Sequence, residues 1–191
     1  MEVTLIAETL DPSKGGIPRY NYEISKIKEI KNVVDFSKSL SNEGLSNKLL
    51  NKLYRRKNVL EKNADKFGKA LHFTQPEVMV KTSELRKRKV ILTVHDLAVF
   101  GTMKVKGVYG SLRGMSFQKQ FKFAVERADT IMVNSTQTRD ELINILKTDP
   151  GKIVVDNLGI EDKFKPLYTK EGIPQAMHSS NGKPKPSYEV G

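Results

Sequence analysis

A histidine and an aspartate at the end of a short apolar run are the residues of this chain best placed to do chemistry. Residues 90–94 are rich in β-branched side chains and show no polar alternation, and His95 and Asp96 follow them directly. Such a run is typical of a strand buried on both faces of a parallel sheet. Open α/β sheets bind ligands beyond the carboxyl ends of their strands. The pair is therefore a candidate site. The alternative is a strand end whose polar residues only hydrogen-bond a neighbouring loop.

The elements that would position this pair alternate between strands and helices. Short apolar runs predict strands over residues 3–7, 33–36, 70–74, 90–94, 129–133 and 152–155. Helical patterns cover residues 20–28, 49–69, 111–128 and 136–146, and a glycine-containing loop is expected over 98–110. This alternation predicts a doubly wound, mostly parallel α/β sheet with helices on both faces. We expect one domain over residues 1–168, followed by a linker and the possible start of another domain over 169–191.

Composition limits the kinds of site that the chain can build. The 191 residues include no cysteine and three widely spaced histidines, so no zinc-ligand spacing is present. No run approaches the length of a membrane span. The net charge is +11, from 33 Lys and Arg against 22 Asp and Glu. That excess suits nucleic acid, an anionic membrane surface or phosphorylated small molecules, and it also suits a lysine-rich surface kept for solubility.

Two basic clusters stand out, Arg55-Arg56-Lys57 and residues 86–89. Neither has the interleaved aromatic residues of a single-strand stacking platform, so nucleic acid is not the expected partner. The first cluster lies on the predicted helix 49–69, which has an apolar stripe and a cationic face. Such a helix can lie on an anionic membrane. The alternative is a packing helix whose cationic face is solvated.

A pair of glycines, Gly15 and Gly16, lies between the first predicted strand and the first helix. Glycines there let a backbone approach a phosphate, and free N–H groups at a helix start favour an anion. The pair is a weak signal, because most such pairs are turns. It is not the GxGxxG pattern, so a nicotinamide cofactor is not indicated.

Four segments together resemble the N-terminal domain of the retaining glycosyltransferases of GT-B fold, the large glycosyltransferase family 4 group. They occur in the same order as four motifs of the family: GGIGRY, HDL, an Ala-Asp pair followed by a serine, and an Asn-Gly pair followed by Phe and Pro. The segments here are residues 14–20, residues 94–97, residues 128–135, and residues 157–160 with 164–166. The resemblance covers roughly residues 1–168 and implies a Rossmann-like domain on the acceptor side of an interdomain cleft.

The resemblance also implies roles for individual residues. His95 would contact the transferred sugar and Asp96 would orient or support it. The remaining cleft residues would be Gly15, Gly16, Arg19, Asn134, Ser135, Asn157 and Gly159. The reaction would transfer a sugar from a nucleotide-sugar to a glycan or lipid-linked acceptor with retention. No cofactor is expected, and no metal, since the DxD metal motif is absent.

The sequence departs from the family pattern at two motifs. Pro18 replaces the third glycine of GGIGRY and removes a backbone N–H. Leu158 separates Asn157 from Gly159 where the family has adjacent residues. Residues 188–191 resemble the start of the family's second domain, which carries most of the nucleotide-sugar site. We therefore expect an N-terminal half, inactive until a C-terminal domain joins it in cis or in trans.

Three functions remain open on the sequence. The first is the acceptor-side half of a cytoplasmic hexosyltransferase that would bind peripherally at the inner membrane face, where Arg55, Arg56 and Lys57 would meet the anionic surface. The second is a stand-alone basic α/β module that binds a phosphorylated ligand, nucleic acid or an anionic membrane. The third is a partner of a separately encoded second domain.

Overall fold

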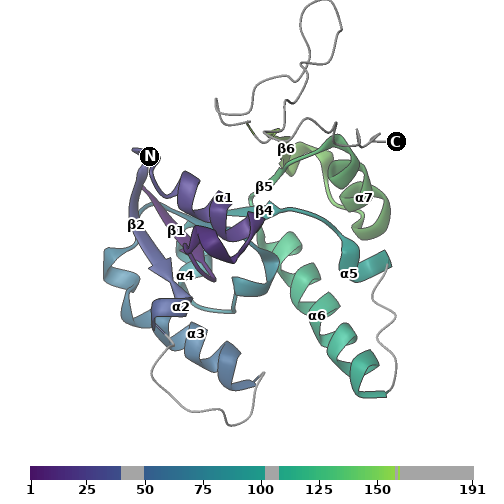
Figure 1. The fold of residues 1–191 in the computed structure, drawn as a ribbon, viewed down its shortest axis with the longest axis horizontal. Helices are drawn as coiled ribbons and strands as arrows, with labels where there is room; N and C mark the ends of the chain where they lie inside the picture. Colours follow the sequence, from purple (N-terminus) through teal and green to yellow (C-terminus); the bar gives the residue numbers. More distant parts are fainter. Residues whose placement is uncertain (40–49, 102–107, 158, 160–191) are drawn as a thin grey trace, which may run out of the picture. The chain divides into compact units, whose positions relative to one another are not determined.

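Six parallel strands form one sheet in the order β2-β1-β3-β4-β5-β6 (Figure 1). The computed structural model describes residues 1–39, 50–101, 108–157 and 159. Every neighbouring pair of strands is parallel, which confirms the predicted α/β class. The strands are β1 (Val3–Ala7), β2 (Ile30–Asp35), β3 (Ala70–Phe73), β4 (Lys89–Val94), β5 (Thr130–Val133) and β6 (Ile153–Val155).

Helices pack on both faces of this sheet. They are α1 (Gly16–Ile24), α2 (Phe36–Ser39), α3 (Leu50–Lys62), α4 (Glu84–Lys87), α5 (Ala98–Gly101), α6 (Val108–Arg127) and α7 (Thr136–Leu146). Short 3₁₀ turns are η1 (Pro12–Lys14), η2 (Ala64–Lys66), η3 (Pro76–Val78) and η4 (Pro150–Lys152). Met1–Asn157 forms one compact unit. The predicted domain boundary at residue 168 lies outside the described residues.

The main core lies between the sheet and helices α3, α6 and α7. Alternate residues of each central strand enter it, such as Leu71 and Phe73 on β3, because successive strand side chains point to opposite faces. Helix α1 covers the other face, where its Tyr20 reaches Thr93 of β4. Helix side chains fully or nearly fully buried in the main core are Leu60, Phe121, Ala124, Val125 and Leu142.

Two helix predictions and one loop prediction need correction. Helix α1 begins at Gly16 and ends at Ile24, whereas residues 20–28 were predicted. The helix starts early because Gly15, at φ 123°, turns the chain into it from η1. Helix α3 ends at Lys62, short of the predicted residue 69. The predicted loop 98–110 contains α5 and the first residues of α6.

No helix in the described part of the chain is both long enough and apolar enough to span a bilayer.

Gly68 provides a test of how tightly the amino edge of the sheet is packed. A Cβ added there would lie 2.5 Å from the carbonyl oxygen of Glu2. The backbone around it is also fixed, because Gly68 N–H donates to Thr4 Oγ1 at 2.8 Å. We expect Gly68→Ala to lower the free energy of unfolding by roughly 1–3 kcal/mol through overpacking, measured by urea denaturation.

Gly114 is the matched control. It lies within α6, and an added Cβ meets nothing within 4 Å. Gly114→Ala should raise stability by about 0.5–1 kcal/mol, because alanine loses less backbone entropy in a helix. Equal effects of the two substitutions would contradict this description of the edge.

Candidate functional site

The carboxyl edge of the sheet has its topological switch point between β1 and β3. The chain leaves β1 for the edge strand β2, then crosses back over β1 to β3. Ligands of open α/β sheets bind at such a point, because the loops diverge there. The loops after β1, β3 and β4 carry Glu8, Glu77 and His95 in turn. Two carboxyl groups and an imidazole thus follow three adjacent strands.

His95 is held as a neutral imidazole at this edge. The Tyr20 ring meets it edge-on, with centroids 5.0 Å apart. Burial lowers the pKa of His95, opposed by a hydrogen bond to the Thr74 backbone and by the charge of Asp96. The Nε2 atom is buried and has no hydrogen-bond partner among the described residues. The bond to Thr74 therefore assigns the proton to Nδ1 and leaves Nε2 as an acceptor.

Two pockets meet at His95 and Asp96. The first, of about 190 Å³, is bordered by the loop after β3, the start of α1 and one side of α6. Its lining includes Ile17, Gln75, Glu77, His95, Asp96, Phe117 and Phe121. The second, of about 560 Å³, faces α7 and is lined by residues including Asn134, Ser135, Thr138 and Glu141. The sequence-predicted residues His95, Asp96, Asn134 and Ser135 are therefore brought together at one edge.

Glu77 is a functional candidate that the sequence reasoning missed. Its Oε2 is buried without a hydrogen-bond partner among the described residues, and its carboxyl lines the first pocket. Burial raises the pKa of Glu77, and a hydrogen bond from its own backbone N–H and the charge of Arg56 oppose this rise, while the charges of Asp96 and Glu8 add to it. The available signal was its position three residues after the predicted strand 70–74, at the same edge as His95.

Arg56 of α3 contacts both of the segments that carry Glu8 and Glu77. Its guanidinium pairs with the Glu8 carboxylate and donates to the Glu77 carbonyl oxygen. It also lies 5.4 Å from the Phe36 ring centroid, a favourable cation–π placement. Its side chain is 5% exposed. A planar guanidinium with several donors can hold two groups in fixed directions.

The burial of Arg56 corrects the prediction that it lies on an exposed anionic-surface face. Arg56 falls on the apolar stripe of α3, three residues after Leu53 and four before Leu60. Leu60 is buried in the core, so a side chain on that stripe points inward. Lys57 is exposed and pairs with Glu61 at 3.7 Å, and Arg55 is half-buried.

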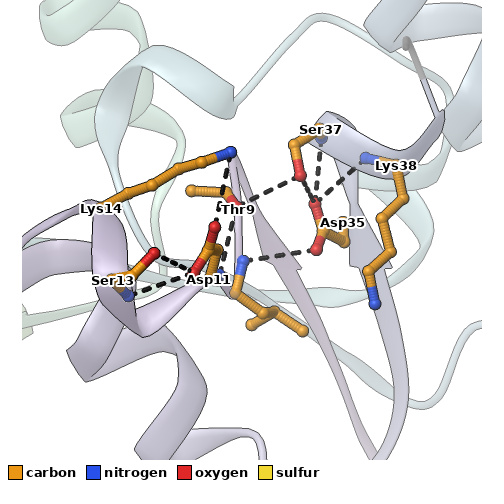
Figure 2. Close-up of polar contacts among 8 residues, drawn as sticks. Thr9, Asp11, Ser13, Lys14, Asp35, Ser37 and Lys38 are labelled. Carbon is orange, nitrogen blue, oxygen red and sulfur yellow. Dashed lines mark hydrogen bonds and ion pairs between the residues drawn. The ribbon is translucent and has the colours of Figure 1, made fainter. Parts of the chain in front are cut away.

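A second polar network fixes the loop that carries Glu8 (Figure 2). Asp35, at the end of β2, accepts from Ser37 N–H at 2.9 Å and from Leu10 N–H at 3.3 Å. Ser37 N–H also donates to the Glu8 carbonyl at 2.8 Å. Thr9 Oγ1 accepts from Ser37 Oγ at 3.2 Å. The loop after β1 is thereby tied to the end of β2, which sets the direction of Glu8.

Asp96 and Ser135 mainly stabilise local structure. Asp96 is exposed and accepts from Ala98 N–H at 3.0 Å, so it begins α5 and acts on His95 through charge. Ser135 is the N-cap of α7 and accepts from Thr138 N–H at 3.1 Å. Thr138 in turn donates to the His95 carbonyl at 3.4 Å. This links α7 to the backbone that carries the imidazole.

The other predicted site residues do not line either of the two pockets. Gly15 and Gly16 start α1 and have open space at their Cβ positions, and their neighbour Ile17 lines the first pocket. Arg19 is exposed on α1, and Asn157 and Gly159 are exposed.

Behind His95, a buried histidine joins a chain of hydrogen bonds across the α1 face. His72 Nε2 lies 2.8 Å from Thr93 Oγ1, and Thr93 Oγ1 lies 3.1 Å from the Tyr20 hydroxyl. Burial, with a smaller effect from His95, lowers the pKa of His72 to about 4. His72 is therefore neutral near pH 7 and fixes the position of Tyr20, which packs against His95.

Comparison with known proteins gives no family: no family model matches the chain, and no curated protein matches it. Among the described residues, no group of three or more His, Cys, Asp or Glu side chains could hold a metal ion.

His72 should make the protein sensitive to mild acid. In the unfolded chain its pKa is near 6.5, whereas in the fold it is about 4. Both states are neutral above pH 6.5, so stability is lost as the pH falls from there toward 4, when only the unfolded chain binds the proton. The loss due to His72 at pH 5 is roughly 2 kcal/mol. His72→Gln should remove this part of the pH dependence in urea denaturation. Parallel curves for the two proteins between pH 7.5 and 5 would contradict it.

Neighbouring residues of α3 test the role of Arg56. Arg56→Met should lower the free energy of unfolding by at least about 2 kcal/mol, because it removes a buried cation and leaves hydrogen-bonding groups unpaired. Lys57→Met, its exposed neighbour, should change stability by less than about 0.5 kcal/mol. Thermal denaturation followed by circular dichroism measures both. Similarly small changes in melting temperature for the two variants would indicate that Arg56 lies on the solvated face of α3.

Proposed function

We propose that this chain provides the acceptor-side domain of a retaining glycosyltransferase of GT-B type. The reaction would move a sugar from a nucleotide-sugar to a glycan or lipid-linked acceptor. The observation that carries the proposal is the pocket lined by the loops after β3 and β4, where Glu77 Oε2 and His95 Nε2 are buried without hydrogen-bond partners among the described residues. Sugars present several hydroxyl groups on an apolar ring, so they suit a pocket with acceptors on one side and Phe117 and Phe121 on another.

Each group has a role in such a transfer. The bond between the anomeric carbon and the diphosphate oxygen breaks, and a bond to the acceptor oxygen forms. His95 Nε2 accepts a hydrogen bond from a sugar hydroxyl and holds the ring in place. The acceptor hydroxyl proton passes to a carboxylate at the edge or to the departing diphosphate. The positive charge that stabilises the diphosphate comes from a second domain, in cis or in trans.

The electrostatics of the edge favour this proposal over a phosphate-binding module. The chain is strongly basic overall, yet Glu77 and Asp96 line the pocket with no lysine or arginine among its described lining residues, and Glu8 beside them is paired with Arg56. The guanidinium is already engaged by Glu8 and by the Glu77 backbone. The pocket is thus acidic within a basic protein, and the basic surface remains available for an anionic membrane.

Saturation-transfer NMR tests the proposal with the chain alone. The probes are methyl α-D-glucopyranoside, methyl α-D-mannopyranoside and a heparin oligosaccharide. We expect transfer to at least one methyl glycoside in 0.15 M salt, and His95→Ala should reduce it about tenfold. Lys119→Ala, an exposed change on α6, is the control and should leave the signal intact.

Two outcomes would reject the proposal in favour of a basic binding module. One is transfer to heparin alone that disappears with modest salt, as expected of counterion release. The other is glycoside binding that His95→Ala leaves unchanged.

A further inference from the structure

We propose that Glu77 and His95 form a two-acceptor clamp for adjacent hydroxyl groups of one uncharged ring, and that the pocket excludes phosphate. The clamp rests on the geometry of the pocket. Identification of the ring as a sugar rests on the proposed function.

Two unsatisfied atoms on one pocket are the first support. Buried polar atoms almost always have hydrogen-bond partners. Here Glu77 Oε2 and His95 Nε2 have none among the described residues, and both side chains line the pocket of about 190 Å³. Both atoms accept hydrogen bonds when the His95 proton is on Nδ1. A ligand that satisfies both must donate twice, as a diol does.

The walls of the pocket set the size and shape of the ligand. Phe121 is buried and Phe117 is half-buried, and both line the pocket with Ile17. These apolar side chains suit the C–H face of a saturated ring, while the acceptors take its hydroxyl groups. Sites for drug-sized ligands exceed about 300 Å³, so this smaller pocket fits a single ring.

Charge explains why the ligand should be neutral. Glu77 and Asp96 both line the pocket, and the charges of Asp96 and Glu8 contribute to raising the pKa of Glu77. Arg56 lowers the pKa of Glu77 through its charge, but it does not line the pocket, and its two terminal nitrogens donate to the Glu77 carbonyl and to Glu8. A phosphate would meet like charges there, and among the described residues no lysine or arginine lines this pocket.

Simple cyclic alcohols test the clamp without assuming a sugar. The ¹⁵N-labelled chain is titrated at pH 7 with cis-cyclohexane-1,2-diol, with cyclohexanol and with inorganic phosphate, and amide shifts are followed. The diol should shift the amides of residues 75–78 and 95–98. Cyclohexanol should bind about five- to tenfold more weakly, because one hydrogen bond is lost. Phosphate should leave these amides unchanged.

Paired substitutions separate hydrogen bonding from structure. Glu77→Gln keeps a carbonyl acceptor and should bind the diol within about threefold of wild type, whereas Glu77→Leu should lose the diol preference. Glu126→Ala, an exposed glutamate of α6, is the control and should behave as wild type. The amide spectrum of each variant reports whether it has folded.

Three results would overturn the clamp: equal affinity for diol and cyclohexanol, phosphate shifts at these amides, or diol binding unchanged in folded Glu77→Leu. Methyl glycoside binding that depends on His95 but not on Glu77 would reject the clamp and leave the proposed function standing. Diol binding that depends on Glu77, with no methyl glycoside bound, would support the clamp and count against the glycosyltransferase.

Discussion

The buried guanidinium of Arg56 is the interaction on which the carboxyl edge depends. It connects α3 to the loop after β1 through Glu8 and to the loop after β3 through the Glu77 backbone. Loss of Glu8 would leave the Arg56 guanidinium, whose side chain is 5% exposed, without its carboxylate, and a buried charge without a partner costs far more than a surface ion pair contributes. One side chain therefore ties together the loops after β1 and β3, and its charge acts on Glu77, which lines the first pocket.

A second set of contacts fixes His95 from the opposite face of the sheet. The Tyr20 ring packs edge-on against the imidazole, and its hydroxyl is anchored through Thr93 to buried His72. On the far side, Thr138 of α7 bonds the His95 backbone. Preorganisation of this kind lowers the entropic cost of binding. The groups around His95 are therefore held in place while its buried Nε2 has no hydrogen-bond partner among the described residues.

The sequence predicted the sheet well because buried parallel strands leave a clear signal. The run at 90–94 and the alternation of apolar segments are properties of neighbouring residues, and they located β4 and the fold class. His95, Asp96, Asn134 and Ser135 could also be placed, because strand ends of a parallel sheet share one edge. The N-cap role of Ser135 was likewise a local property, readable from its position between a strand and a helix.

Arg56 and Glu77 could not be found in this way, because their roles depend on contacts between distant segments. Arg56 lies 48 residues from its partner Glu8, and its basic neighbours suggested a solvated face. The position of Arg56 on the apolar stripe of α3 indicated instead that its side chain is buried. His95 belongs both to the motifs that resemble the glycosyltransferases and to the lining of the pocket. A ligand bound at His95 therefore tests the proposed function and the description of the pocket together.

A crystal structure of the chain soaked with methyl α-D-mannopyranoside is the most direct measurement. The account predicts one sugar ring in the pocket against Phe117 and Phe121, with adjacent hydroxyl oxygens about 3 Å from His95 Nε2 and Glu77 Oε2. A sugar bound only elsewhere, or a pocket filled by water alone at saturating sugar, would contradict it.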